Sequence, residues 1–149
     1  VGRGELLRAG ADVALLALGW GVAPALQAAE RLAAEGLHAA VVNARFVKPL
    51  DAPLILDLAR QTRRLVTIED HNLMGGFGSA VLELLADHGL PDVAVARVGL
   101  PDAFQAHGPA DALRAQHGLS AAGIAQTARA LAAAHLRVRI PAGRLVVRA

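Results

Sequence analysis

The 149-residue sequence contains no cysteine and no tyrosine, and it has only one tryptophan and three phenylalanines. The absence of cysteine excludes disulfides, a thiolate nucleophile and cysteine-ligated metal sites. The scarcity of aromatic side chains argues against a surface on which the bases of single-stranded nucleic acid stack. Apolar residues are abundant instead: they make up 54% of the chain, with alanine supplying many of them. This composition is typical of helices packed closely on a sheet.

Charge of one sign accumulates only at one end of the chain. The formal net charge is +2, but residues 137–149 carry four arginines and no acid. The other residues hold 11 basic and 13 acidic side chains, a net charge of −2, without the basic face that binds a phosphate backbone. We therefore expect no nucleic acid partner. One alternative stays open, in which the arginine-rich end binds nucleic acid.

We also expect no membrane partner. Residues 13–29 contain no charge, but Gly19, Gly21 and Pro24 divide them into a buried strand and a helix. The first ten residues lack the apolar core of a signal peptide. The chain begins with Val rather than Met, as a piece of a longer polypeptide would. We expect a cytoplasmic location.

Strand and helix patterns alternate along the chain. The predicted strands are 5–8, 13–18, 38–44, 65–68 and 93–98, and the predicted helices are 22–35, 53–61, 79–88, 109–116 and 120–134. Asp51 and Ser120 are the expected N-caps of the second and fifth helices. The alternation predicts a three-layer α/β fold, with a mixed, mostly parallel sheet of about five strands and helices on both faces.

The same patterns divide the chain into three parts. Residues 1–12 are expected to be a linker and edge strand, residues 13–135 the domain, and residues 136–149 a basic tail. Within that tail, residues 136–140 and 144–147 alternate around Pro141 and Gly143. Either a terminal hairpin or a disordered end agrees with this pattern.

The stretch 64–90, RLVTIEDHNLMGGFGSAVLELLADHGL, is the best candidate for a functional edge. It predicts a buried strand, a polar loop, a glycine turn and a helix, and loops at the carboxyl ends of parallel strands form the ligand crevice of such sheets. The candidate residues, which we expect at a domain or subunit interface, are Glu69, Asp70, His71, Asn72, Gly75, Gly76 and Gly78.

Two interpretations of these residues compete. Glu69, Asp70 and His71 have the chemistry of an acid/base cluster or of metal ligands, but three consecutive residues do not converge on one point without another segment. In the simpler interpretation, Asp70 and Asn72 hydrogen-bond the backbone of the glycine turn, and His71 lies at a surface or interface. We favour the simpler interpretation and expect no metal site, since the other histidines are scattered without ligand spacing.

Two glycine motifs were considered as ligand sites. Gly19 and Gly21 resemble a dinucleotide fingerprint, but Pro24 replaces its third glycine and Asn43 its acid, so a plain tight turn accounts for them better. The glycines of residues 75–78 precede a helix and could hold an anion. No lysine or arginine is adjacent to them, which makes that interpretation weaker.

Four stretches are more specific together than any one alone. They are RFVKPLD (45–51), LVTIEDHNLMGGFGSAV (65–81), GLPDAFQAHG (99–108) and GLSAAGI (118–124). In this order they resemble the C-terminal domain of the 1-deoxy-D-xylulose-5-phosphate synthase family, a branch of the transketolase family. RFVKPLD alone is shared with transketolases and pyruvate dehydrogenase β subunits, whereas GLPD with the later HG and GL…GI indicates the synthase branch.

The resemblance implies a thiamin-diphosphate enzyme that joins pyruvate to glyceraldehyde 3-phosphate with loss of CO2, in isoprenoid precursor synthesis. In that family the first domain holds the diphosphate and Mg²⁺, and the second supplies the glutamate that activates the cofactor. The resemblance therefore implies no catalytic, cofactor-binding or metal residue in this chain, which would be inactive alone. Its partners would be the preceding domains and a second copy in a homodimer.

Two departures from the family pattern qualify this resemblance, at residues 69–72 and at the arginine-rich end from Arg137, which extends past the usual family terminus. Relatives often have Glu-Glu-Asn or Glu-Glu-Gly where this chain has residues 69–72, so no role for His71 is inherited. The alternatives are the C-terminal domain of another thiamin-diphosphate enzyme, of transketolase or pyruvate dehydrogenase β type, and a free-standing nucleotide-binding module.

Overall fold

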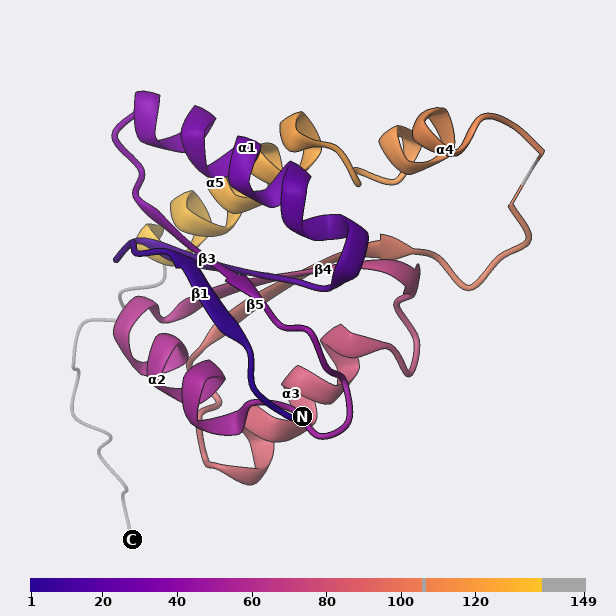
Figure 1. Cartoon of the computed structure of the whole chain (residues 1–149). Helices are drawn as coiled ribbons and strands as arrows, with labels where there is room; N and C mark the ends of the chain where they lie inside the picture. Colours follow the sequence, from indigo (N-terminus) through magenta and orange to yellow (C-terminus); the bar gives the residue numbers. More distant parts are fainter. Residues whose placement is uncertain (106, 138–149) are drawn as a thin grey trace, which may run out of the picture.

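A five-stranded sheet forms the middle layer of the computed structural model, which describes residues 1–105 and 107–137. The strands are β1 (Glu5–Arg8), β2 (Val13–Ala17), β3 (Ala39–Asn43), β4 (Arg64–Asn72) and β5 (Ala94–Leu100), in the order β1-β3-β2-β4-β5. All neighbouring strands are parallel except β1, which runs antiparallel to β3 (Figure 1). The expected mixed, mostly parallel sheet is confirmed.

Helices cover both faces of this sheet, as expected. They are α1 (Val22–Ala34), α2 (Ala52–Thr62), α3 (Phe77–Asp87), α4 (Ala110–Gln116) and α5 (Ala121–Arg137), and a short 3-10 turn, η1 (Gly19–Gly21), precedes α1. Helices α1 and α5 pack on one face, and α2 and α3 pack on the other (Figure 1). Among the described residues, no helix is long and apolar enough to cross a membrane.

The central strand β2 shows why the sequence folds into three layers. Every residue of β2 is fully buried. Val13 and Leu15 contact the cluster under α1 and α5, whereas Ala14 and Leu16 contact the cluster under α2 and α3. A strand that is covered on both faces carries a continuous apolar run, because successive side chains point to opposite faces.

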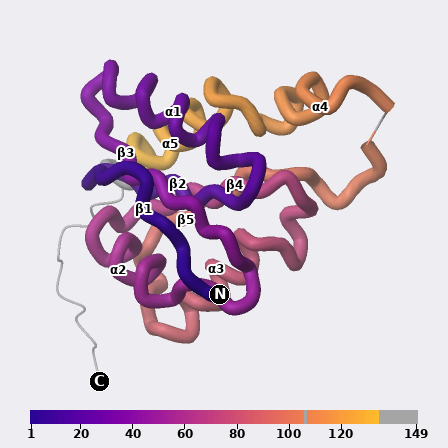
Figure 2. Tube along the Cα trace, viewed as in Figure 1, coloured from indigo at the N-terminus to yellow at the C-terminus, as the bar shows by residue number. Residues whose placement is uncertain are grey.

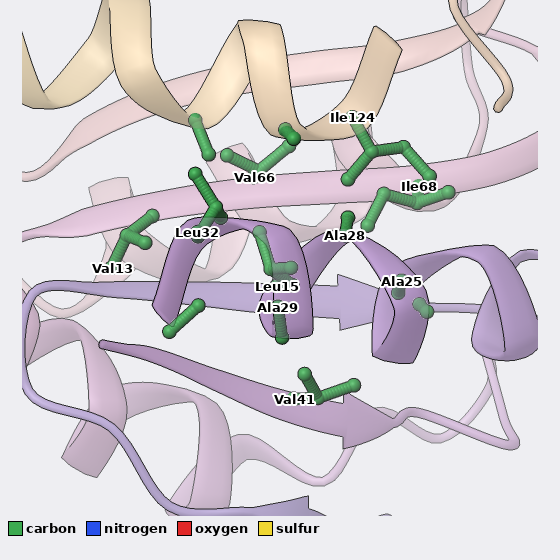
Figure 3. Close-up of a cluster of buried hydrophobic side chains, with 14 of the residues drawn as sticks. Val13, Leu15, Ala25, Ala28, Ala29, Leu32, Val41, Val66, Ile68 and Ile124 are labelled. Carbon is green, nitrogen blue, oxygen red and sulfur yellow. The ribbon is translucent and has the colours of Figure 1, made fainter. Parts of the chain in front are cut away.

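Small side chains let the helices approach this sheet closely. Figure 3 shows Ala25, Ala28 and Ala29 on α1, which crosses in front of the sheet, and Ile124 next to Ile68. All five side chains are fully buried. Some of the many alanines of the sequence thus lie where α1 and α5 contact the sheet.

Both expected helix caps are present. The Asp51 carboxylate accepts the Leu54 amide at 3.2 Å, and its second oxygen accepts the Gly4 amide at 2.9 Å. The Ser120 hydroxyl accepts the Gly123 amide at 3.1 Å. Asp51 therefore also fastens the segment that leads into β1.

Several boundaries differ from the sequence expectation. Strand β4 continues through residues 69–72, which were expected to form a loop, because β5 also continues and pairs Leu100 with Asn72 across a bulge. Helix α3 begins at Phe77, so that Gly78 lies inside it. Helix α5 continues to Arg137, and the rest of the expected hairpin or tail, residues 138–149, lies outside the described residues.

Candidate functional site

A cavity of about 460 Å³ lies where the fold predicts a crevice, at the carboxyl ends of β2 and β4. Its walls come from η1, the last part of β4, the glycine turn and the start of α3, with one residue from the loop after β3. The lining residues are Leu18, Gly19, Trp20, Val47, Glu69, Asp70, His71, Gly75, Gly76 and Phe77. Five of the seven candidate residues therefore border one cavity.

Glu69 is the buried acid of this site, with a side chain 1% exposed. One carboxylate oxygen accepts the Phe77 amide at 2.6 Å, and the other accepts the Gly78 amide at 2.8 Å. These amides belong to the first turn of α3, whose N–H groups have no partner inside the helix and favour a negative charge. Glu69 thus caps a helix from the neighbouring strand, and this contact occupies both of its oxygens.

The glycine turn is shaped by contacts within the chain. A Cβ atom on Gly76 would collide with the Glu69 carboxylate and with the carbonyl oxygen of Asn72. A Cβ on Gly78 would lie 2.6 Å from the Thr67 hydroxyl oxygen. Gly75 has φ +70°, with open space around it, so this glycine is used for its backbone conformation. Contacts within the chain therefore account for Gly76 and Gly78, and backbone conformation accounts for Gly75, while the expected interface at this turn stays a prediction.

Asp70 does not hydrogen-bond the glycine turn, which corrects one sequence expectation. Its carboxylate instead accepts Arg114 Nη2 at 2.7 Å and Nε at 2.9 Å. The Arg114 guanidinium also lies 4.2 Å from the centre of the Trp20 ring, a cation–π contact. The hydrogen bond to Asp70 raises the pKa of Arg114 above its ordinary value.

Asn72 and His71 follow the simpler interpretation. Asn72 Oδ1 accepts the Met74 amide at 2.8 Å, which stabilises the turn. Its amide nitrogen donates to Asp102 at 2.9 Å, connecting the loops after β4 and β5. His71 is exposed, and its Nδ1 lies 3.2 Å from the Asn72 carbonyl oxygen. Within the described ranges, no group of three or more acidic or histidine side chains is arranged to hold a metal ion.

A second network fixes the far side of the glycine turn. Arg97 Nη1 donates to the Leu73 carbonyl at 3.0 Å and to the Ser79 hydroxyl at 3.1 Å. The Ser79 hydroxyl also accepts the Gly75 amide at 3.2 Å. The turn is therefore held both by Glu69 and by the Arg97–Ser79 pair.

Sequence reasoning missed two residues of the site, Trp20 and Arg114. Trp20 was considered only as part of a turn, and Arg114 lies 44 positions from its partner Asp70. The pairing has no local signal, because short helices commonly carry an acid and an arginine three residues apart, as Asp111 and Arg114 are here.

The possible dinucleotide turn is also explained by the fold. A Cβ atom on Gly21 would lie 2.8 Å from the Ile68 side chain, so this glycine permits η1 to pack against β4. Gly19 has φ +55°. Both glycines thus allow the tight turn between β2 and α1.

Comparison with protein families gives a match to the model described as "Transketolase, C-terminal domain" over residues 2–124. The 1-deoxy-D-xylulose-5-phosphate synthase 1 of Geobacter sulfurreducens is 54% identical over 134 residues, covering 90% of this chain and 21% of that protein. The protein of the same name from Geobacter metallireducens is 57% identical over 129 residues, covering 87% of this chain and 21% of that protein. The chain thus spans about a fifth of the length of these relatives.

Among solved structures, the chain is similar to one titled "Split gene transketolase, inactive beta4 tetramer". The TM-score is 0.82 and the sequence identity 39%, and the match covers 89% of this chain and 43% of that chain. More than half of the solved chain therefore lies outside the matched part.

Proposed function

The chain belongs to the transketolase C-terminal domain family, and from that premise we propose that it is the C-terminal domain of a 1-deoxy-D-xylulose-5-phosphate synthase. The observation that carries the proposal is the sequence identity of 54–57% to relatives of that name over nearly all of the described chain. The whole enzyme would be a thiamin-diphosphate-dependent transferase that condenses pyruvate with glyceraldehyde 3-phosphate and releases CO2. This domain would supply structure and contribute no catalytic residue.

The side chains of the candidate site support a structural role. Both Glu69 oxygens are committed to the amides of α3, and Asp70 is committed to Arg114. Glu69 thereby caps α3, and Asp70 holds the Arg114 side chain of α4 against the end of β4. These contacts join segments that are distant in the sequence, which is a structural role.

Thiamin diphosphate and Mg²⁺ do not fit the residues of this chain. A diphosphate needs hydrogen-bond donors, and the amides at the start of α3 already donate to Glu69. Mg²⁺ is usually held by one or two carboxylates together with phosphate oxygens and waters, and the Glu69 carboxylate beside those amides already accepts both of them. We therefore assign the cofactor and the ion to other domains of the enzyme.

The proposed partners are the preceding domains of the same enzyme and a second copy in a homodimer. The relatives are about five times longer than the matched part, which supports the first partner. The Glu69–Gly78 segment would lie at a domain or subunit interface. The location would be the cytoplasm, which cell fractionation would test.

A chimera tests this proposal. The C-terminal domain of the Geobacter sulfurreducens synthase is replaced by the present chain, and formation of 1-deoxy-D-xylulose 5-phosphate is measured. We expect the chimera to turn over substrate at a rate near that of the parent enzyme, and the isolated chain to show no turnover. A folded chimera without activity, or an isolated chain with activity, would contradict the proposal.

A further inference from the structure

An arm extends from the sheet on the same side as the cavity. It consists of residues 101–105 and 107–117, which include the loop after β5 and helix α4 (Figure 1). Its described residues up to Ala112 are all exposed, and α4 has no buried residue. The Phe104 side chain is fully exposed. A single chain gains little by ordering such a segment, because little apolar area is buried there.

The arm is nevertheless tied to the rest of the molecule. Arg114 connects it to Asp70 and Trp20. The Asp102 carboxylate accepts the side-chain amide of Asn72, and His117 Nε2 lies 2.6 Å from Gln105 Oε1, which joins the loop after β5 to the residue that follows α4. These few contacts help to set the position of a largely uncovered element.

Three large apolar side chains are exposed at this end of the strands. Trp20, Met74 and Phe104 belong to the loops after β2, β4 and β5, and their side chains are 40%, 71% and 108% exposed. The charged groups beside them are paired within the chain, because Arg114 binds Asp70 and Asp111, and Asp102 binds Asn72. We call Trp20, Met74 and the arm the edge surface. Its chemistry suits a largely apolar partner.

The start of the chain lies at the same end of the strands, but on the β1 side of the sheet, whereas the arm follows β5 on the other side (Figure 2). Strand β1 is antiparallel to β3, with Glu5 opposite Asn43, the last residue of β3. Asn43 is in turn level with Ala17, the last residue of β2. Figure 2 shows the N-terminus beside the loop after β3, and Gly2 is close to Pro49 of that loop. A domain that precedes this one would therefore enter at the carboxyl ends of the parallel strands.

We propose that the edge surface docks onto the domain that precedes this one in the same polypeptide, with Phe104 inserted into an apolar pocket of that domain. Arg114 acts as a positioning residue, since it fixes the arm against Asp70 and Trp20 before docking. The inference rests on the proposed function, because it requires a longer enzyme. The inference adds to that function the identity of the surface that faces the preceding domain.

Photo-cross-linking in the chimera described above tests the docking. Phe104 is replaced by p-benzoylphenylalanine, which keeps an aromatic ring, and irradiated peptides are identified by mass spectrometry. The matched control carries the same residue in place of Leu82, which is 39% exposed on α3. Mixing unlabelled and ¹⁵N-labelled enzyme distinguishes links within one polypeptide from links between two.

We expect position 104 to cross-link to the preceding domain of its own polypeptide, several-fold more than position 82. Links only to a second polypeptide, or no links in an active chimera, would overturn the docking proposal and leave the proposed function intact. A folded but inactive chimera whose position 104 still links to the preceding domain would instead contradict the proposed function alone. A chimera that is inactive and unlinked would refute both.

The positioning role of Arg114 has its own readout. Trp20 is the only tryptophan and the chain has no tyrosine, so its fluorescence reports this one site. Arg114→Ala should change the Trp20 emission of the isolated chain and lower the cross-linking yield of position 104 several-fold, with part of the yield restored by Arg114→Lys. The control Asp111→Asn, which removes a 90% exposed partner, should change neither. Unchanged emission and unchanged yield in Arg114→Ala would exclude the role.

Discussion

At the scale of single residues, Glu69 shows how a buried charge becomes structural. Carboxylates are rarely buried without a partner, because the loss of hydration is costly. Here the charge lies at the N-terminus of α3, where two short amide hydrogen bonds and the helix dipole offset that cost. Sequence reasoning found Glu69 as a candidate but assigned it no contact, because N-caps normally come from the residue just before the helix.

Removing the Glu69 carboxylate should therefore destabilise the fold. We expect Glu69→Ala to lower the free energy of unfolding by about 2–4 kcal/mol, because two buried amides lose a charged acceptor. Urea denaturation followed by circular dichroism measures the change. Glu83→Gln, on the exposed face of the same helix, is the control and should have little effect. Equal stability of the two variants would show that the cap contributes nothing.

Thr67 is also buried, but its polar group lacks the hydrogen-bond partners that Glu69 has. Its side chain is fully buried under α3, and its hydroxyl has no hydrogen-bond partner within the described structure. Thr67→Val keeps the shape and removes the unpaired hydroxyl, so the free energy of unfolding should stay equal or rise by up to about 1 kcal/mol. Thr62, whose hydroxyl donates to the Leu58 carbonyl at 2.9 Å, is the matched control. Thr62→Val should lose about 1 kcal/mol, and a larger loss from Thr67→Val would contradict the assignment.

At the scale of elements, the glycine turn between β4 and α3 uses two neighbouring glycines for different reasons. Gly75 has a positive φ with open space around it, whereas Gly76 has φ −84° and no room for a Cβ atom. Gly75→Ala should therefore cost about 1–2 kcal/mol of unfolding free energy through backbone strain. Gly76→Ala should cost more, because the added Cβ displaces Glu69 from its cap. Chemical denaturation of both variants measures the order, and the reverse order would contradict this assignment.

The same turn shows which features of the structure the sequence patterns predict and which they do not. The apolar run of β2 and the alternation of strands and helices predicted the layers, since both depend on local periodicity. The predicted end of β4, at residue 68, was wrong. Residues 69–72 are polar, and their strand conformation depends on pairing with β5, about 30 positions later in the chain. Likewise, the Asp70–Arg114–Trp20 cluster joins three distant segments, and no spacing rule indicates such a contact.

At the scale of the whole molecule, burial is unevenly distributed along the sheet. The central strands β2 and β4 are covered on both faces, whereas the residues of β1 are mostly exposed and no described residue of the arm is buried. Local opening costs least where few apolar contacts must break. The molecule therefore combines a rigid centre with an edge surface that contributes little to its stability.

Amide hydrogen exchange of the isolated chain should reveal this gradient. We expect the slowest exchange in β2, whose amides pair with strands on both sides, and the fastest exchange within the described chain in the arm. In the chimera the arm should gain protection, because docking covers it, while β2 should exchange as before. Arm amides that exchange as slowly as those of β2 in the isolated chain would mean that contacts within this domain already stabilise the arm. The edge surface would then need no partner to explain its order.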